Sequence, residues 1–180
     1  MYIEDVRKLF EYYRLLGEKT FDQLTEEQMF WQFNSESNSI ATIIKHLSGN
    51  MLSRWTDFLT TDGEKEWRNR DSEFEIGIET KEEILTLWEK GWRCLFDSLN
   101  SLTENDLSKI VCIRNQEHSV LQAINRQLAH YPYHIGQIVY IGKMVCNENW
   151  KTLSIPKGRS NEFNSTMLTE QKKGKHFTDK

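Results

Sequence analysis

The segment from Ser119 to Val145 constrains the fold most, because it repeats apolar residues at steps of three and four. Residues at these steps lie on one face of an α-helix. Ser119-Val120-Leu121-Gln122 has the form of a capping box, which predicts where this helix begins. Pro132 should kink the helix, unless it marks a helix start instead. The expected core stripe consists of Leu121, Ile124, Leu128, Tyr131, Ile135, Ile138 and Val145.

Three earlier segments show the same periodicity, from about Ile3 to Lys19, from Asn38 or Ser39 to about Leu59, and from Thr80 to about Leu102. Thr80-Lys81-Glu82-Glu83 is a second capping box, and Thr25-Glu26-Glu27-Gln28 is a third that opens a short piece. The predicted fold is therefore all-α. In the second long segment the expected core stripe is Ile40, Ile44, Leu47, Met51, Trp55 and Phe58.

Two stretches interrupt the helical pattern. Ile110-Val111-Cys112-Ile113 is a short strand or an extended link, and residues 60–79 form a long connection. Large apolar side chains in a charged loop normally dock onto a surface, so we expect Trp67 and Phe74 to pack on the helices. The charged residues of this connection form either an internal salt-bridge cluster, which we favour, or the rim of a site. They are Arg68, Arg70, Asp71 and Glu73.

The chain of 180 residues with 38% hydrophobic content suits one domain. We place this domain at residues 1–164 and a basic tail at 165–180, with residues 171–180 expected to be mobile. Phe163 and the Ser-Ile-Pro-Lys-Gly stretch at 154–158 should return across the helices.

The net charge of −4 and a pI near 5.8 give no electrostatic reason to expect a nucleic acid or a membrane as partner. No apolar run approaches the roughly 20 residues that cross a bilayer, and the N-terminus does not resemble a signal peptide. We expect a cytoplasmic protein. Cys94, Cys112 and Cys146 are widely spaced, which disfavours both a disulfide framework and a thiolate zinc site.

Two of the five histidines, His130 and His134, stand four residues apart in the last predicted helix. Their side chains share one face, so both can reach one ion. They flank the core stripe and face the seam with a neighbouring helix, and His46 has a corresponding flank or surface position on its own helix. Three histidines could meet over one seam. Alternatively, His130 and His134 are seam histidines bonded to carboxylates or backbone.

Other catalytic motifs are missing from the sequence. It has no His-Glu-x-x-His zinc protease pattern, no Gly-x-Ser-x-Gly nucleophile motif and no glycine-rich phosphate loop. His118 and His176 are the weakest candidates for metal ligands.

The run His130-Tyr-Pro-Tyr-His134-Ile-Gly136-Gln137-Ile138, with a histidine on the second long helix, resembles the DinB/YfiT-like superfamily of proposed metalloenzymes. Residues 67–74, 154–158 and 161–164 look like a branch of it catalogued as a domain of unknown function, and the resemblance covers about residues 1–164. It implies a four-helix bundle with up-down-down-up topology, often dimeric, and a divalent metal held by His46, His130 and His134. We therefore expect a homodimer.

Relatives in that superfamily include metal-dependent hydrolases, thiol-dependent S-transferases and a mycothiol-dependent maleylpyruvate isomerase. Three neutral imidazoles leave a metal an open position, as in catalytic zinc sites. We expect zinc, with nickel, iron or manganese as alternatives, and a small-molecule substrate. A metal-activated water would make the protein a hydrolase. A metal-bound low-molecular-weight thiol would make it an S-transferase. A non-catalytic metal-binding or stress-response interaction protein is a further alternative.

Supporting residues follow from the same spacing. Asn50 and Gln137 lie near the predicted ligand lines and could orient the histidines. Arg70 is a candidate for contact with an anionic part of the substrate, because a guanidinium suits a carboxylate or a phosphate. No carboxylate stands at a spacing that identifies a general base.

Overall fold

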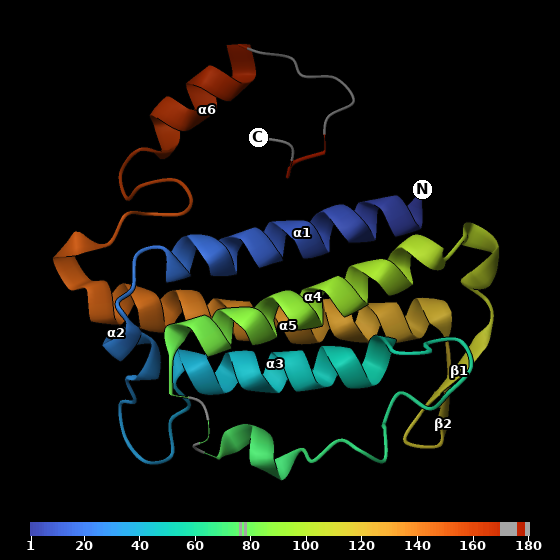
Figure 1. The fold of residues 1–180 in the computed structure, drawn as a ribbon. Helices are drawn as coiled ribbons and strands as arrows, with labels where there is room; N and C mark the ends of the chain where they lie inside the picture. Colours follow the sequence, from blue (N-terminus) through green and yellow to red (C-terminus); the bar gives the residue numbers. More distant parts are fainter. Residues whose placement is uncertain (76, 78, 170–175, 179–180) are drawn as a thin grey trace.

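The computed structural model describes residues 1–75, 77, 79–169 and 176–178, and these are mostly helical (Figure 1). The four long helices lie side by side, with α3 and α4 running in one direction and α1 and α5 in the other. The α-helices of the described part are α1 (Tyr2–Phe21), α2 (Glu26–Phe30), α3 (Ile40–Trp55), α4 (Lys81–Ser101), α5 (Val120–Cys146) and α6 (Ser160–Thr169). Short 3-10 turns are η1 (Asp71–Phe74), η2 (Glu104–Asp106) and η3 (Asn147–Asn149).

All four long helices contribute to one hydrophobic core. At its centre the aromatic ring of Phe10 on α1 contacts Trp55 on α3, Trp92 on α4 and Tyr131 on α5, with centroid separations of 5.7 to 6.4 Å. Such edge-on and tilted ring contacts are favourable beyond the apolar area that they bury. The stripe predicted for α3 is buried throughout.

Hydrogen bonds hold α3 and α5 in a fixed register within this core. The Trp55 indole N–H donates to the Tyr131 hydroxyl over 3.0 Å, and that hydroxyl donates to Asn50 Oδ1 over 3.1 Å. All three side chains are buried. A buried polar chain that is fully bonded fixes one arrangement of its elements. Tyr131 follows His130 directly, and Asn50 lies one turn beyond His46.

The predicted helix starts are confirmed. Thr25, Thr80 and Ser119 each accept a hydrogen bond from the third residue of their helix, whose side chain bonds back to the cap, as a capping box requires. Ser39 is the N-cap of α3, although that helix ends at Trp55 and not near Leu59. A helix cap depends on residues within three positions of each other, which is why the sequence alone predicts it.

The core stripe predicted for α5 needs one correction, and the structure decides between the two interpretations of Pro132. Leu121 is 37% exposed, and Val120 takes its place in the core, because α5 begins at Val120 with a slightly different face inward. Pro132 lies inside α5, so it does not start a helix.

A two-stranded hairpin adds to the predicted all-α fold. Strand β1 (Ile110–Ile113) pairs antiparallel with β2 (Gln116–Ser119), so residues 110–113 are a strand. The two turn residues, Arg114 and Asn115, have positive φ angles of 56° and 57°, as a type I′ turn requires. Asp62 stabilises this turn by accepting both of their backbone N–H groups.

The connection between α3 and α4 lies along α3 (Figure 1). Gly63 N–H bonds to the carbonyl of Cys112, which ties the connection to the hairpin. The prediction that Trp67 docks on the helices is wrong, because its side chain is 61% exposed. Phe74 is 39% exposed, and its ring lies 5.1 Å from that of His46.

The C-terminal part differs from the prediction, since α6 forms where no helical periodicity was recognised. This helix runs across residue 164, where the sequence places the start of the tail. Phe163 is 44% exposed, so its expected return across the helices is wrong. The prediction of mobility for residues 171–180 falls mostly on 171–175 and 179–180, which lie outside the described residues. Within the described part, every helix is too short or too polar to cross a membrane.

Candidate metal centre

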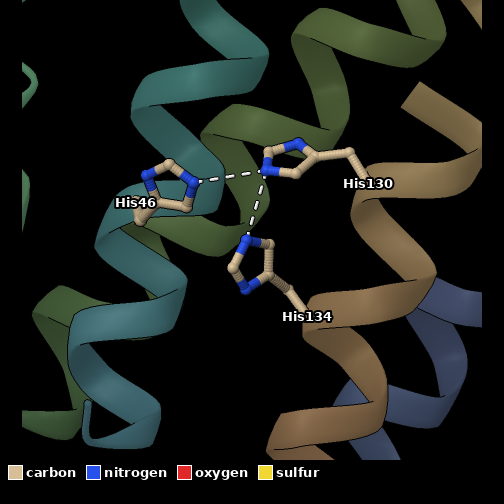
Figure 2. Close-up of side chains that lie close together, drawn as sticks. All are labelled: His46, His130 and His134. Carbon is tan, nitrogen blue, oxygen red and sulfur yellow. Dashed lines mark hydrogen bonds between the residues drawn. The ribbon is translucent and has the colours of Figure 1, made fainter. Parts of the chain in front are cut away.

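Three histidines meet between α3 and α5. Figure 2 shows the His46 ring extending from α3 towards the rings of His130 and His134, which come from successive turns of α5. Nε2 of His130 lies 3.4 Å from Nε2 of His46 and 3.2 Å from Nε2 of His134. His46 is buried and the other two are half-buried. The surface position that spacing allowed for His46 is therefore wrong.

The separations fit a single metal ion. Zinc binds imidazole nitrogen at about 2.0 to 2.1 Å in tetrahedral geometry, which places two such nitrogens roughly 3.3 Å apart. The two separations measured here bracket that value, and one ligand atom from each of the three histidines lies within 4.8 Å of the others. These three side chains could hold a metal ion.

The outer ring nitrogens of two histidines fix their tautomers. His46 Nδ1 lies 2.9 Å from Glu73 Oε2, and His134 Nδ1 lies 2.7 Å from Gln137 Oε1. An ionised carboxylate and an amide oxygen only accept hydrogen bonds, so both Nδ1 atoms carry the proton. The Nε2 atoms of His46 and His134 then present lone pairs to His130.

A neutral His130 cannot satisfy both of these lone pairs. It holds one ring proton, and a single proton at Nε2 serves one good hydrogen bond. Burial, and then the neighbouring His134 and His46, lowers the pKa of His130 to about 3. Burial also lowers the pKa of His134. Both rings are therefore neutral near pH 7, the form in which imidazole binds metals.

Glu73 orients His46, and sequence spacing did not assign it this role. Arg68 donates from Nε to Glu73 Oε1 over 2.8 Å and from Nη2 to Oε2 over 3.0 Å. Burial raises the pKa of Glu73, but the hydrogen bonds from His46 and Arg68 outweigh burial and leave the pKa below its usual value. The carboxylate thus stays ionised, which suits a partner of a metal-binding histidine.

A glycine on α3 makes room for this carboxylate. A side chain at Gly49 would place its Cβ 2.8 Å from Glu73 Cδ, closer than such atoms approach in proteins. Glu73 comes from η1, 27 residues after His46, through a connection without helical periodicity. No pattern in the sequence relates the two positions, which is why this contact was not predicted.

A cavity of about 410 Å³ opens beside the histidines. Five arginines belong to its wall: Arg54, Arg68, Arg70, Arg114 and Arg126. Two carboxylates bond to three of them. Glu64 Oε2 lies 3.1 Å from Arg54 Nη2 and 2.9 Å from Arg114 Nε, and Glu73 pairs with Arg68. Of the four residues for which the sequence favoured a salt-bridge cluster, Arg68 and Glu73 form an ion pair, and Arg68 also belongs to the cavity wall.

The other residues that the sequence suggested for the site differ in their contacts with the histidines. Gln137 bonds to His134, whereas Asn50 faces the cavity but accepts its hydrogen bond from Tyr131. Arg70 lies on the cavity wall, and among the described residues it forms no ion pair with Asp71 or Glu73, contrary to the cluster predicted for it. His118 bonds to Arg126 outside the cluster.

Fold and site define a mostly helical protein with a three-histidine cluster between two of its helices. The chain belongs to the family described as "Protein of unknown function (DUF1572)", whose model matches residues 1–159. No match was found among curated proteins or among solved structures.

Proposed function

We propose that this protein is a metal-dependent hydrolase in which His46, His130 and His134 hold a divalent ion, zinc in the first place. One observation carries the proposal. Nε2 of buried His46 and Nε2 of half-buried His134 each lie at a metal-ligand separation from Nε2 of His130, and a neutral His130 cannot satisfy the lone pairs of both. A cation at this point would satisfy all three. When bound, zinc with three imidazole ligands acidifies a coordinated water towards neutral pH, which makes that water a nucleophile.

The chain's own residues prepare this chemistry. Glu73 and Gln137 hold the protons of His46 and His134 on Nδ1, and so direct their Nε2 lone pairs inward. Burial keeps His130 neutral. The cavity beside the cluster has a volume within the range of small-molecule sites, which is roughly 300 to 1,000 Å³.

We also infer that the four long helices form the up-down-down-up bundle of the DinB/YfiT-like superfamily. The directions of α1, α3, α4 and α5 in Figure 1 support this inference. The ligand positions agree with it, because one histidine comes from the second long helix and two from the last.

A metal ion held by three histidines alone would keep a coordination position open, which would favour an enzyme over a metal-buffering protein. In the described part of the chain the metal-ligand group consists of the three histidines. Cys94, a possible fourth ligand in a closed site, bonds to Thr56 and faces a different cavity. The S-transferase alternative requires the same three ligands, so only an activity screen separates it from a hydrolase.

Metal analysis tests the ligand assignment. Protein purified without a histidine tag and loaded with zinc should retain close to one ion per chain after dialysis. His130→Ala should lose it, because two imidazoles bind a first-row ion weakly. His118→Ala is the matched control and should retain the ion. If the His130→Ala variant retained one zinc ion per chain, the assignment of His130 as a ligand would be wrong.

The reaction class needs a second measurement on the same samples. Small esters and amides, and thiols paired with electrophiles, should be screened with zinc-loaded, metal-free and zinc-restored protein. Hydrolysis that disappears with the metal and returns with zinc supports the hydrolase. Zinc-dependent thiol transfer without hydrolysis would replace it with the S-transferase.

A further inference from the structure

The wall of the histidine cavity carries an excess of positive charge. Among the described residues, its lining contains five arginines and no aspartate or glutamate, and the carboxylates that bond to those arginines are Glu64 and Glu73. The whole chain, in contrast, has a formal net charge of −4. Positive charge concentrated in one concave site of an acidic protein favours negatively charged ligands there.

Two of the five arginines, Arg70 and Arg126, have no carboxylate partner among the described residues. Arg126 Nη1 lies 3.3 Å from His118 Nε2, and the Arg70 guanidinium lies 5.5 Å from the Phe74 ring centroid. Both side chains are exposed, so they keep their charge at little cost. Both belong to the cavity wall, where a ligand could contact them.

Arg126 and Arg70 are each linked to one of the three histidines. Arg126 stands four residues before His130 on α5 and therefore shares its face of the helix. Arg70 is held against Phe74 by a cation–π contact, and the Phe74 ring in turn lies against His46. The two guanidinium groups thus approach the cluster from α5 and from the connection before η1.

Two other arginines of the same wall have donors without a hydrogen bond. Arg54 Nε and Arg68 Nη1 are buried and form no hydrogen bond with any described residue, although Arg68 Nη1 lies 3.7 Å from Glu64 Oε1 in an ion pair. Buried N–H groups of this kind are uncommon and costly in folded proteins. An anion or an ordered water in the cavity is the natural acceptor for them.

We propose that the substrate carries a carboxylate or a phosphate group, which Arg70 and Arg126 hold at the wall of the histidine cavity. A guanidinium binds either group through two parallel N–H···O contacts, so the pair would fix the orientation of the ligand as well as its charge. The inference rests on the proposed function, since it names the substrate class of the same site. In this proposal Arg70 and Arg126 bind the substrate, whereas His46, His130 and His134 bind the metal ion.

The test uses inorganic phosphate and succinate as probes, titrated calorimetrically into the zinc-loaded full chain. At least one probe should bind, and Arg70→Gln and Arg126→Gln should each weaken its binding about tenfold, as expected for the loss of a charge-assisted contact. Binding should also weaken as salt is added. Arg7→Gln on α1 is the matched control, because it removes the same charge from an exposed position away from the cavity.

The outcomes separate this inference from the proposed function. Binding of phosphate alone or of succinate alone, weakened in the arginine variants, supports the inference and tells which group the substrate carries. It is overturned if neither probe binds, or if both arginine variants bind like wild type while retaining zinc. Failure of wild type to hold zinc would overturn the metal site instead. In that case the same titrations on metal-free protein still test the arginines.

Discussion

Glu73 connects the histidine cluster to an arginine of the cavity wall. Its carboxylate joins Arg68 to His46, and all three side chains are buried. A histidine whose outer nitrogen bonds to a carboxylate is a better metal ligand, because its ring is oriented and more basic. Removing the charge of Glu73 should therefore weaken metal binding without removing a ligand.

Glu73→Gln should lower the zinc affinity by roughly 10- to 100-fold, the usual effect of losing such a partner. The measurement is a competition titration with a zinc chelator at a temperature where the variant is fully folded. Glu66→Gln is the control in the same connection, since Glu66 is exposed and should leave the affinity unchanged. Equal affinities in wild type and Glu73→Gln would show that the carboxylate does not support the site.

At the scale of elements, the site depends on how closely η1 approaches α3. Gly49 lies where a side chain would collide with the Glu73 carboxylate. Alanine at this helical position would gain roughly 1 kcal/mol in intrinsic helix propensity over glycine, yet it would push Glu73 away from His46. The added methyl group should therefore change metal binding through the spacing of two elements.

We predict that Gly49→Ala lowers zinc affinity in the same direction as Glu73→Gln, although it removes no polar atom. Gly136→Ala on α5 is the control, because no atom lies within 4 Å of an added Cβ there. That control should stabilise the protein by about 1 kcal/mol and leave zinc affinity unchanged. Chelator competition and thermal unfolding report the two quantities. An unchanged zinc affinity in Gly49→Ala would contradict the role of the spacing.

For the whole molecule, the histidine cluster links folding stability to pH. Burial lowers the pKa of His130 from 6.5 to about 3, and lowers that of His134 as well. In the unfolded chain both rings take up protons as the pH falls below about 6.5, whereas in the folded protein they take them up only at lower pH, His130 at about pH 3. The unfolded state therefore binds more protons in this window, and the free energy of unfolding must fall as the pH falls.

We expect urea unfolding of the metal-free protein to show lower stability at about pH 5 than at about pH 7. His130→Gln should reduce this difference, because it removes one of the groups that titrate only in the unfolded chain. The window lies above the range in which most carboxylates protonate, which limits their contribution. The same pH dependence in wild type and His130→Gln would show that His130 is not held neutral by the fold.

The sequence carried much of this architecture but only part of the site. Helix starts and core stripes depend on residues three or four apart, so Ser119, Thr80 and the stripe of α3 were predictable. The burial of His46 was not predictable, because it results from the position of η1 against α3, where Glu73 and Phe74 contact the His46 ring. For Trp67 the error has the opposite direction. Its side chain was expected to be buried against the helices, but it is exposed.

Gly49 also gives a way to compare members of the family from their sequences alone. A relative with any larger residue at this position could not seat a carboxylate beside its first histidine as this chain does. Such a relative would need another partner for that ring, or would hold its ion less tightly. A single small residue, with no chemistry of its own, can therefore mark which relatives share this arrangement.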